Sequence, residues 1–300
     1  MIGPAAIEPN PRQSRFAVFA RDIKLSHTVF ALPFALLSAF IAAGGFPRAG
    51  QFALILACMV SARTVAMAAN RLLDARLDAL NPRTATRAIP SGRLSARFYV
   101  GVLVACSACF IAAAAMFWPL YRNPWPLYLA VPVLAFLAGY PLLKRFTTAC
   151  HYYLGAALGL APVAAWIAIR GDVAASPLVL GAGVMLWTAG FDIIYATLDI
   201  DVDRRTGLFS MPARWGLRGA LWISRASHAL AAACLAVTGI LADRLGAIYL
   251  AAVGLAAALL VVEHLLVREN DLSRVNTAFF TINGIVSVLV GTAGIVDVLL

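Results

Sequence analysis

Long apolar stretches recur along the chain and are separated by short segments rich in glycine, proline, asparagine and charge. An apolar run of roughly 17–25 residues can cross a bilayer as one helix. Turn signals such as Asn81-Pro82 and Asn123-Pro124 mark where successive runs end. The pattern therefore predicts about nine transmembrane helices. Their expected spans are 27–44, 51–70, 97–118, 126–142, 149–169, 177–198, 219–241, 245–267 and 276–298.

The composition supports an integral, multi-pass membrane protein. Hydrophobic residues make up 62% of the chain and charged residues 13%, whereas soluble domains carry about 25% charge. The predicted fold class is all-α. We expect a cytoplasmic N-terminal segment over 1–26, followed by a single transmembrane domain over 27–300.

Basic residues fall mainly on one side of the predicted bundle. If the N-terminus lies inside, the outer loops hold Arg48, Arg122, Arg170 and Arg244, and two more arginines, Arg63 and Arg225, lie within helices. The other 18 of the 24 lysines and arginines face the cytoplasm, as the positive-inside rule requires. This asymmetry accounts for the net charge of +10 without nucleic acid as a partner.

Two clusters of acids sit at the cytoplasmic ends of helices. Asn70, Asp74 and Asp78 are four residues apart, so they share one helical face. Tyr195, Asp199 and Asp203 repeat this spacing. Carboxylates are costly near a bilayer, and four around one cavity would repel each other unless cations neutralised them. The clusters favour Mg²⁺ holding a phosphate, although either alone also fits a solvated helix end paired with arginines.

Other polar residues near the acids are candidates for substrate contact. Arg63 lies inside an apolar helix and needs a partner, either a substrate carboxylate or the intramembrane Asp192. Lys144, Arg87 and Arg204 lie on the cytoplasmic side and suit phosphate oxygens. Contact with anionic lipid and snorkelling at the interface are the alternatives for these cations. The four histidines show no metal-ligand spacing, and Phe30, Phe34, Phe279 and Phe280 are read as packing residues.

The paired motifs resemble those of the UbiA superfamily of intramembrane aromatic prenyltransferases. The first family motif, Asn-x-x-x-Asp-x-x-x-Asp, stands as Asn70, Asp74 and Asp78, and the second, Tyr-x-x-x-Asp-x-x-x-Asp, as Tyr195, Asp199 and Asp203. The stretches 27–34, 191–196 and 271–276 look like the 4-hydroxybenzoate polyprenyltransferase branch, which includes enzymes assigned to the futalosine route to menaquinone. The resemblance implies nine transmembrane helices around a central cavity in a bacterial inner or plasma membrane, with the active site toward the cytoplasm.

The resemblance also implies a reaction. Asn70, Asp74, Asp78, Asp199 and Asp203 would hold Mg²⁺ against the diphosphate of a polyprenyl donor. Lys144, Tyr195, Arg87 and Arg204 would contact substrate, Arg63 would bind the acceptor carboxylate, and Asp192 would orient or deprotonate the ring hydroxyl. The acceptor could be 4-hydroxybenzoate or dihydroxynaphthoate. An ion-coupled transporter is the alternative from another class, although transporters more often place charge near the midplane.

Overall fold

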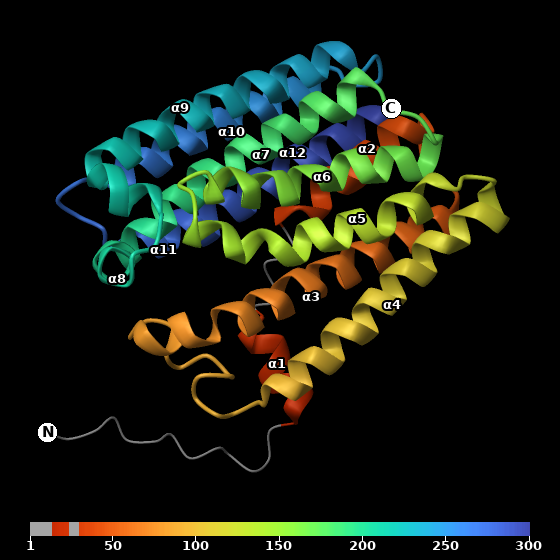
Figure 1. Ribbon diagram of the computed structural model, residues 1–300. Helices are drawn as coiled ribbons and strands as arrows, with labels where there is room; N and C mark the ends of the chain where they lie inside the picture. The colour runs from red at the N-terminus through yellow and green to blue at the C-terminus, as the bar shows by residue number, and fades with distance from the viewer. Residues whose placement is uncertain (1–13, 24–29) are drawn as a thin grey trace, which may run out of the picture.

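The computed structural model describes residues 14–23 and 30–300, and every helix or strand assigned in this part of the chain is a helix, with no strand (Figure 1). Eight helical segments are long and apolar enough to cross a membrane, and a ninth apolar helix is shorter. This confirms the predicted all-α membrane fold. The first half contains α1 (Arg15–Asp22), α2 (Leu32–Ala43), α3 (Ala49–Leu80), α4 (Ala96–Tyr121), α5 (Trp125–Gly139), the 3₁₀ segment η2 (Tyr140–Arg145) and α6 (Cys150–Arg170).

The second half of the chain repeats this up-and-down course. It contains α7 (Ala175–Ala196), the 3₁₀ turn η3 (Thr197–Asp199), α8 (Ile200–Thr206), α9 (Met211–Leu241), α10 (Ala247–Leu266), α11 (Val275–Thr277), the π-helical segment η4 (Ala278–Ile282) and α12 (Asn283–Leu299).

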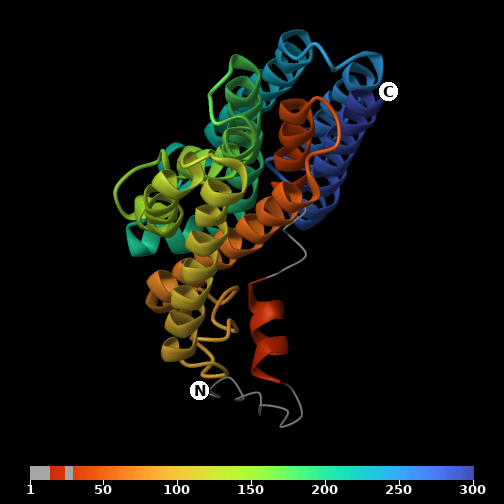
Figure 2. The same ribbon diagram turned by 90° about the vertical axis from the view of Figure 1, so that its right-hand side faces the viewer.

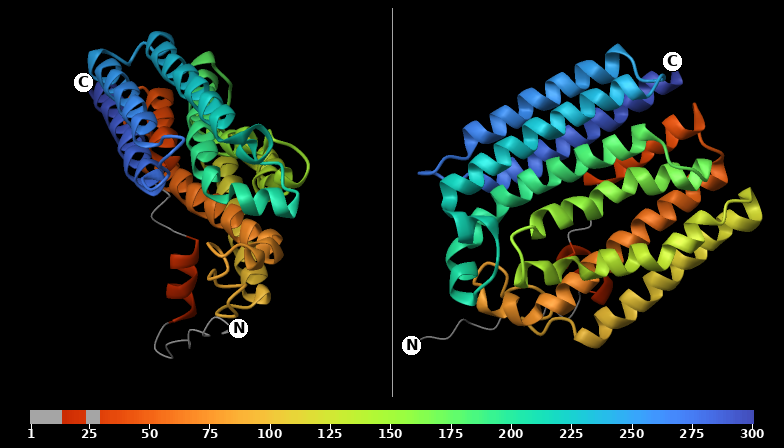
Figure 3. Two further views of the ribbon diagram at one scale, coloured as in Figure 1. Left: turned by 90° about the vertical axis from the view of Figure 1, so that its left-hand side faces the viewer. Right: turned by 45° about the horizontal axis from the view of Figure 1, so that its top comes forward.

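The long helices run side by side, so the helix ends that carry the two acid motifs gather at one end of the bundle. There, α8 lies beside the loop between α3 and α4 (Figures 1 and 3). Helix α1 stands below the bundle next to the same loop (Figure 2). Phe19 and Ile23 fix it there, because both are buried in a cluster with Ala88, Leu94 and Tyr99.

Three predicted boundaries are wrong. The span 27–44 appears as α2, which begins at Leu32, and residues 24–29, including His27, lie outside the described residues. The span 51–70 extends to Leu80, so the first acid motif continues the membrane helix for almost three more turns. The span 219–241 begins at Met211, but the helix is broken at Gly216, which has φ 71°. Glycine tolerates that left-handed backbone, which explains why the apolar pattern resumed only after the break.

Helix α7 packs between α6 and α9. It approaches α6 very closely where glycine faces glycine. A Cβ atom on Gly181 would lie 2.6 Å from the carbonyl oxygen of Gly159, and one on Gly159 would collide with the Gly181 carbonyl. Backbone therefore touches backbone at this crossing, as in membrane helix pairs with small residues at their interface.

Candidate active site

The first acid motif lies on the last turns of α3, where its carboxylates are buried. The side chain of Asp74 is 1% exposed, and its Oδ2 accepts from Lys144 Nζ at 2.6 Å and from Asn70 Nδ2 at 2.9 Å. Arg145 Nη2 lies 3.6 Å from the other oxygen of Asp74. Both cations come from η2, whose position is fixed by a hydrogen bond from Phe209 N to Lys144 O at 2.7 Å. Charge pairing is therefore what makes this buried acid tolerable.

The loop after α3 supplies the partner of the next acid. Arg87 Nη1 donates to both oxygens of Asp78, at 2.7 and 2.8 Å. Asp78 is nearly fully buried, and Thr84 Oγ1 donates to its backbone carbonyl at 3.1 Å. The prediction placed Arg87 against substrate phosphate, and in this structure the same guanidinium neutralises Asp78.

The second acid motif crosses a break in the helix. Tyr195 lies in α7, Asp199 ends the 3₁₀ turn and Asp203 lies in α8, so the single continuous helical face that we expected does not form. The ring of Tyr195 packs against Phe279, with centroids 4.2 Å apart. Asp203 is half-buried and forms no ion pair within the described part of the chain.

Two residues of the loop after α3 connect the motifs. Asn81 Nδ2 donates to Asp199 Oδ1 at 2.8 Å, and Arg83 Nε donates to the same oxygen at 2.9 Å. Arg83 also bonds to Asp199 Oδ2, and its Nη1 donates to Tyr195 Oη at 2.7 Å. Burial opposes the charge of Arg83, but the bonds to Asp199 and Tyr195 outweigh it and raise the pKa of Arg83. The two acid motifs thus share one polar network.

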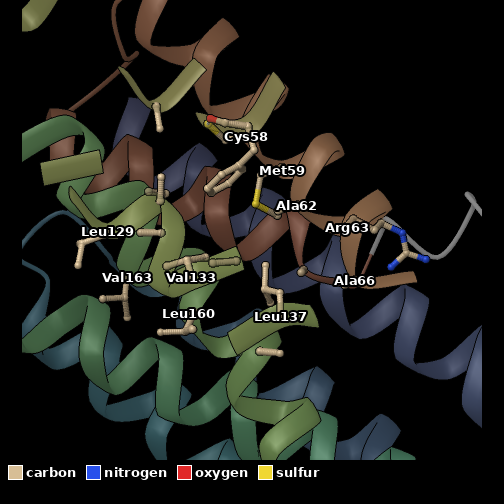
Figure 4. Close-up of a pocket in the computed structure, with 18 of the residues that line it drawn as sticks. Cys58, Met59, Ala62, Arg63, Ala66, Leu129, Val133, Leu137, Leu160 and Val163 are labelled. Carbon is tan, nitrogen blue, oxygen red and sulfur yellow. The ribbon is translucent and has the colours of Figure 1, made fainter. Parts of the chain in front are cut away.

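An apolar cavity of about 430 Å³ lies among α3, α4, α5 and α6 (Figure 4). Its lining is almost entirely alanine, leucine, valine and other apolar side chains, and Arg63 is the one charged residue among the described residues that line it. Arg63 stands at the rim, and its guanidinium points away from Leu129, Val133 and Leu160 (Figure 4). Tyr140, the first residue of η2, lines the same cavity, so the segment that carries Lys144 also borders the apolar space.

Comparison with known proteins identifies this arrangement. Residues 31–285 match the UbiA prenyltransferase family. The chain belongs to that family. Its resemblance to these enzymes is confirmed, and as a family member it is a prenyltransferase rather than an ion-coupled transporter.

Named relatives of this UbiA family member are 4-hydroxybenzoate prenyltransferases. The 4-hydroxybenzoate octaprenyltransferase of Xanthomonas oryzae pv. oryzae (strain PXO99A) is 32% identical over 255 residues, which cover 85% of this chain and 83% of the relative. The 4-hydroxybenzoate octaprenyltransferase of Aromatoleum aromaticum is 26% identical over 292 residues, covering 96% and 95%.

Solved structures share the fold. An apo UbiA homologue from Aeropyrum pernix K1 superposes with a TM-score of 0.81 at 37% identity, covering 91% of this chain and 98% of that one. A UbiA homologue from Archaeoglobus fulgidus bound to DMAPP and Mg²⁺ superposes with a TM-score of 0.67 at 19% identity, covering 93% and 98%.

The oxygen donors of this UbiA protein suit a hard divalent cation. Asp74 Oδ1 is buried and has no hydrogen-bond partner in the described residues, although Asp74 is otherwise fully engaged. No three histidine, cysteine, aspartate or glutamate side chains of the described chain form a ready-made metal group, so the expected ring of four carboxylates is absent, because lysine and arginine separate the acids. Mg²⁺ uses few carboxylates and completes its shell with water and phosphate, so this donor set still fits it.

The structure places the remaining predicted residues as follows. Asp192 Oδ2 lies 2.7 Å from His151 Nδ1, so its partner is a histidine that the sequence analysis did not select as a site residue, and not Arg63. Arg204 is exposed and donates to the Ala213 carbonyl at 3.1 Å, away from the acids. Phe30, Phe34 and Phe279 are buried in the core and Phe280 packs against it, which confirms the packing assignment.

Asn81, Arg83 and Arg145 join the site although the sequence reading did not select them. The only sequence signal for the first two was their position directly after the motif, in a loop read as a turn with several interchangeable arginines.

Proposed function

We propose that this chain transfers a polyprenyl group from polyprenyl diphosphate to 4-hydroxybenzoate, on the cytoplasmic side of a bacterial inner membrane. The observation that carries the proposal is that η2 joins the buried first acid motif to the apolar cavity, because it contributes both Tyr140 and Lys144. The named relatives support the acceptor, and the Archaeoglobus homologue bound to DMAPP and Mg²⁺ supports the donor and the metal.

The acid motifs would bind the donor head. Mg²⁺ held by Asp74, Asp78, Asp199 and Asp203, with Asn70, would act as a Lewis acid on the leaving diphosphate. Lys144 and Arg87 neutralise two of these acids here. Once cations take over that task, the Lys144 ammonium would bind diphosphate oxygens, and the Arg87 guanidinium would be free to contact a phosphate group. Arg204 would have to leave the Ala213 carbonyl to join them.

The apolar cavity would hold the prenyl chain and exclude water. The allylic carbon–oxygen bond breaks and its electron pair leaves with the diphosphate. A ring carbon beside the acceptor hydroxyl then bonds to the allylic carbon and loses its proton. A water-poor wall of alanine and leucine protects the allylic cation from hydrolysis during this step.

The acceptor would bind at the cytoplasmic rim of the cavity. Arg63 would bind the acceptor carboxylate through its fork of donors. Asp192, fixed by His151 at 2.7 Å, would orient the ring hydroxyl and Tyr195 would contact substrate beside it. His151 Nε2 in turn receives the backbone N–H of Met211 at 3.2 Å, so the orientation of this pair is built into the fold.

The proposal is tested with purified full-length protein, a labelled polyprenyl diphosphate, Mg²⁺, and 4-hydroxybenzoate or 1,4-dihydroxy-6-naphthoate in parallel reactions. We expect a prenylated 4-hydroxybenzoate by mass spectrometry, and loss of product with Asp74→Ala or Asp199→Ala. Asp201→Ala is the matched control, because Asp201 is an exposed acid of the same cluster and product should persist. Prenylation of the naphthoate alone would reject the acceptor, and full activity in both motif variants would reject the metal assignment.

A further inference from the structure

A second pocket, of about 230 Å³, lies between α1, α3 and the loop after α3. We call it the arginine pocket. Neither the motif carboxylates nor Lys144 line it, so it is distinct from the apolar cavity and from the acid site. Its charged lining consists of Arg21, Arg71, Arg83, Arg87, Arg93 and Asp22.

The acid in the arginine pocket is already satisfied. Asp22 accepts from Arg71 Nε at 3.0 Å, from Ala88 N at 2.8 Å and from Tyr99 Oη at 2.6 Å. The side chains of Asp22 and Arg71 are each 4% exposed. This network joins α1 to α3, α4 and the loop, so the pocket has a fixed wall. A satisfied buried network of this kind gives rigidity.

Positive charge in the pocket exceeds what its own acid can balance. Among the described residues, Arg21 forms no ion pair, and Arg93 bonds only to Ser91 Oγ and the Thr86 carbonyl. Arg83 and Arg87 face the pocket as well, but their donors reach across to Asp199 and Asp78. Several guanidinium groups around one small concavity are the arrangement that recognises phosphate oxygens.

We propose that the arginine pocket binds a phosphate group, carried either by free inorganic diphosphate or by an anionic lipid, at a site separate from the acid motifs. Arg83 and Arg87 couple the two sites. Whatever neutralises Asp78 and Asp199 releases these guanidinium groups toward the pocket, so phosphate there and cations at the acids should strengthen one another. Only the choice of diphosphate as the free anion rests on the proposed function, because the proposed prenyl transfer releases diphosphate.

The first test titrates inorganic diphosphate into the full chain in detergent with EDTA, followed by calorimetry. We expect saturable binding that Arg93→Gln and Arg21→Gln each weaken by about ten-fold, the size of one charge-assisted contact. Arg97→Gln is the matched control, because this exposed arginine lies in the first turn of α4, outside the pocket. Absence of binding, or equal weakening by Arg97→Gln, would overturn the site. Loss of binding in Lys144→Gln with none in Arg93→Gln would place the anion at the acids and overturn it too.

The second test addresses coupling and the source of the phosphate. Asp78→Asn should bind diphosphate about ten-fold more tightly, because Arg87 no longer has an anionic partner; unchanged or weaker binding would reject the coupling. In nanodiscs, phosphatidylglycerol should weaken diphosphate binding relative to phosphatidylcholine if lipid phosphate fills the pocket, and leave it unchanged if the free anion does. If phosphatidylglycerol still weakens diphosphate binding in Arg93→Gln, the arginine pocket is not the site and the proposal is rejected. No donor or acceptor is present, so the outcome is independent of prenyl transfer.

Discussion

Helices α3–α6, the cavity half, and helices α7–α12, the core half, have similarly apolar sequences but pack differently. In the most apolar window of each membrane segment, between 17% and 28% of residues are buried in the cavity half, against 33% to 61% in the core half. In Figure 1 the core half forms the upper layers and the cavity half the lower ones. Hydropathy therefore indicates that a helix can span the membrane, but it does not determine how tightly the neighbouring helices pack against it.

Side-chain size explains the difference. Alanines from α3, α4, α5 and α6 line the cavity, whereas Trp187, Phe191 and Tyr249 fill the core half. The core half also holds a buried polar chain. Trp187 Nε1 donates to Asn283 Oδ1 at 2.7 Å, and Asn283 Nδ2 donates to Glu263 Oε1 at 2.8 Å. Large rings and paired polar groups leave no space, while small residues leave room for a substrate chain.

The largest expected effect comes from opening the core half. Trp187→Ala removes a side chain that is 1% exposed and leaves Asn283 without its donor. We expect the free energy of unfolding in detergent to fall by about 3–5 kcal/mol. Trp222→Ala, at a side chain that is 59% exposed, should change it little. Equal losses in both variants would erase the distinction between core and surface tryptophans.

Filling the cavity with a larger side chain should lower prenyl transfer activity rather than stability. Ala62 lines the cavity beside Arg63 (Figure 4), so Ala62→Phe takes up space needed by a prenyl chain. We expect transfer from a long-chain donor to fall by about 100-fold, as for a displaced substrate, and transfer from geranyl diphosphate to fall less. Ala57→Phe on the exposed face of the same helix is the control. If both donors lose activity equally, the cavity does not hold the chain.

Breaking the buried polar chain should have an intermediate effect. Asn283→Leu strands the Trp187 N–H and the Glu263 carboxyl, each of which loses a partner. We expect a loss of about 1–3 kcal/mol, measured by chemical unfolding in detergent. When Glu263→Leu is added, the double variant should lose less free energy of unfolding than the sum of the losses in the two single variants. Strict additivity would show that the two side chains do not interact.

The smallest effects should come from exposed ion pairs, one in each half. Arg170 and Asp172 lie 3.9 Å apart and Arg218 and Glu269 lie 3.8 Å apart, all with side chains more than half exposed. Asp172→Asn and Glu269→Gln should each change the free energy of unfolding by less than about 1 kcal/mol. A larger change in one half would show that its surface, as well as its interior, differs.

The membrane helices, the family and both acid motifs could be predicted from the sequence, because each depends on the spacing of residues close together in the chain. It did not reveal that Asp192 pairs with His151, 41 residues away, or that Arg83 reaches Asp199 across 116 residues. Such pairs depend on which helices become neighbours, and a loop with several arginines offers no local reason to prefer one. The continuous face expected for Tyr195, Asp199 and Asp203 also failed, because a 3₁₀ turn shifts the register at Thr197–Asp199. The metal and substrate roles of the site residues remain predictions.

The glycine contact between α6 and α7 has a mechanical consequence. Helix α6 forms one wall of the cavity, yet at Gly159 and Gly181 its backbone rests directly on that of α7. The two glycines place no side chain between the helices at this contact, so α6 behaves as a fixed partition. The cavity can widen for a bulkier lipid tail only if its other three walls, α3, α4 and α5, yield. Substitutions that stiffen those helices should therefore narrow the range of tails admitted.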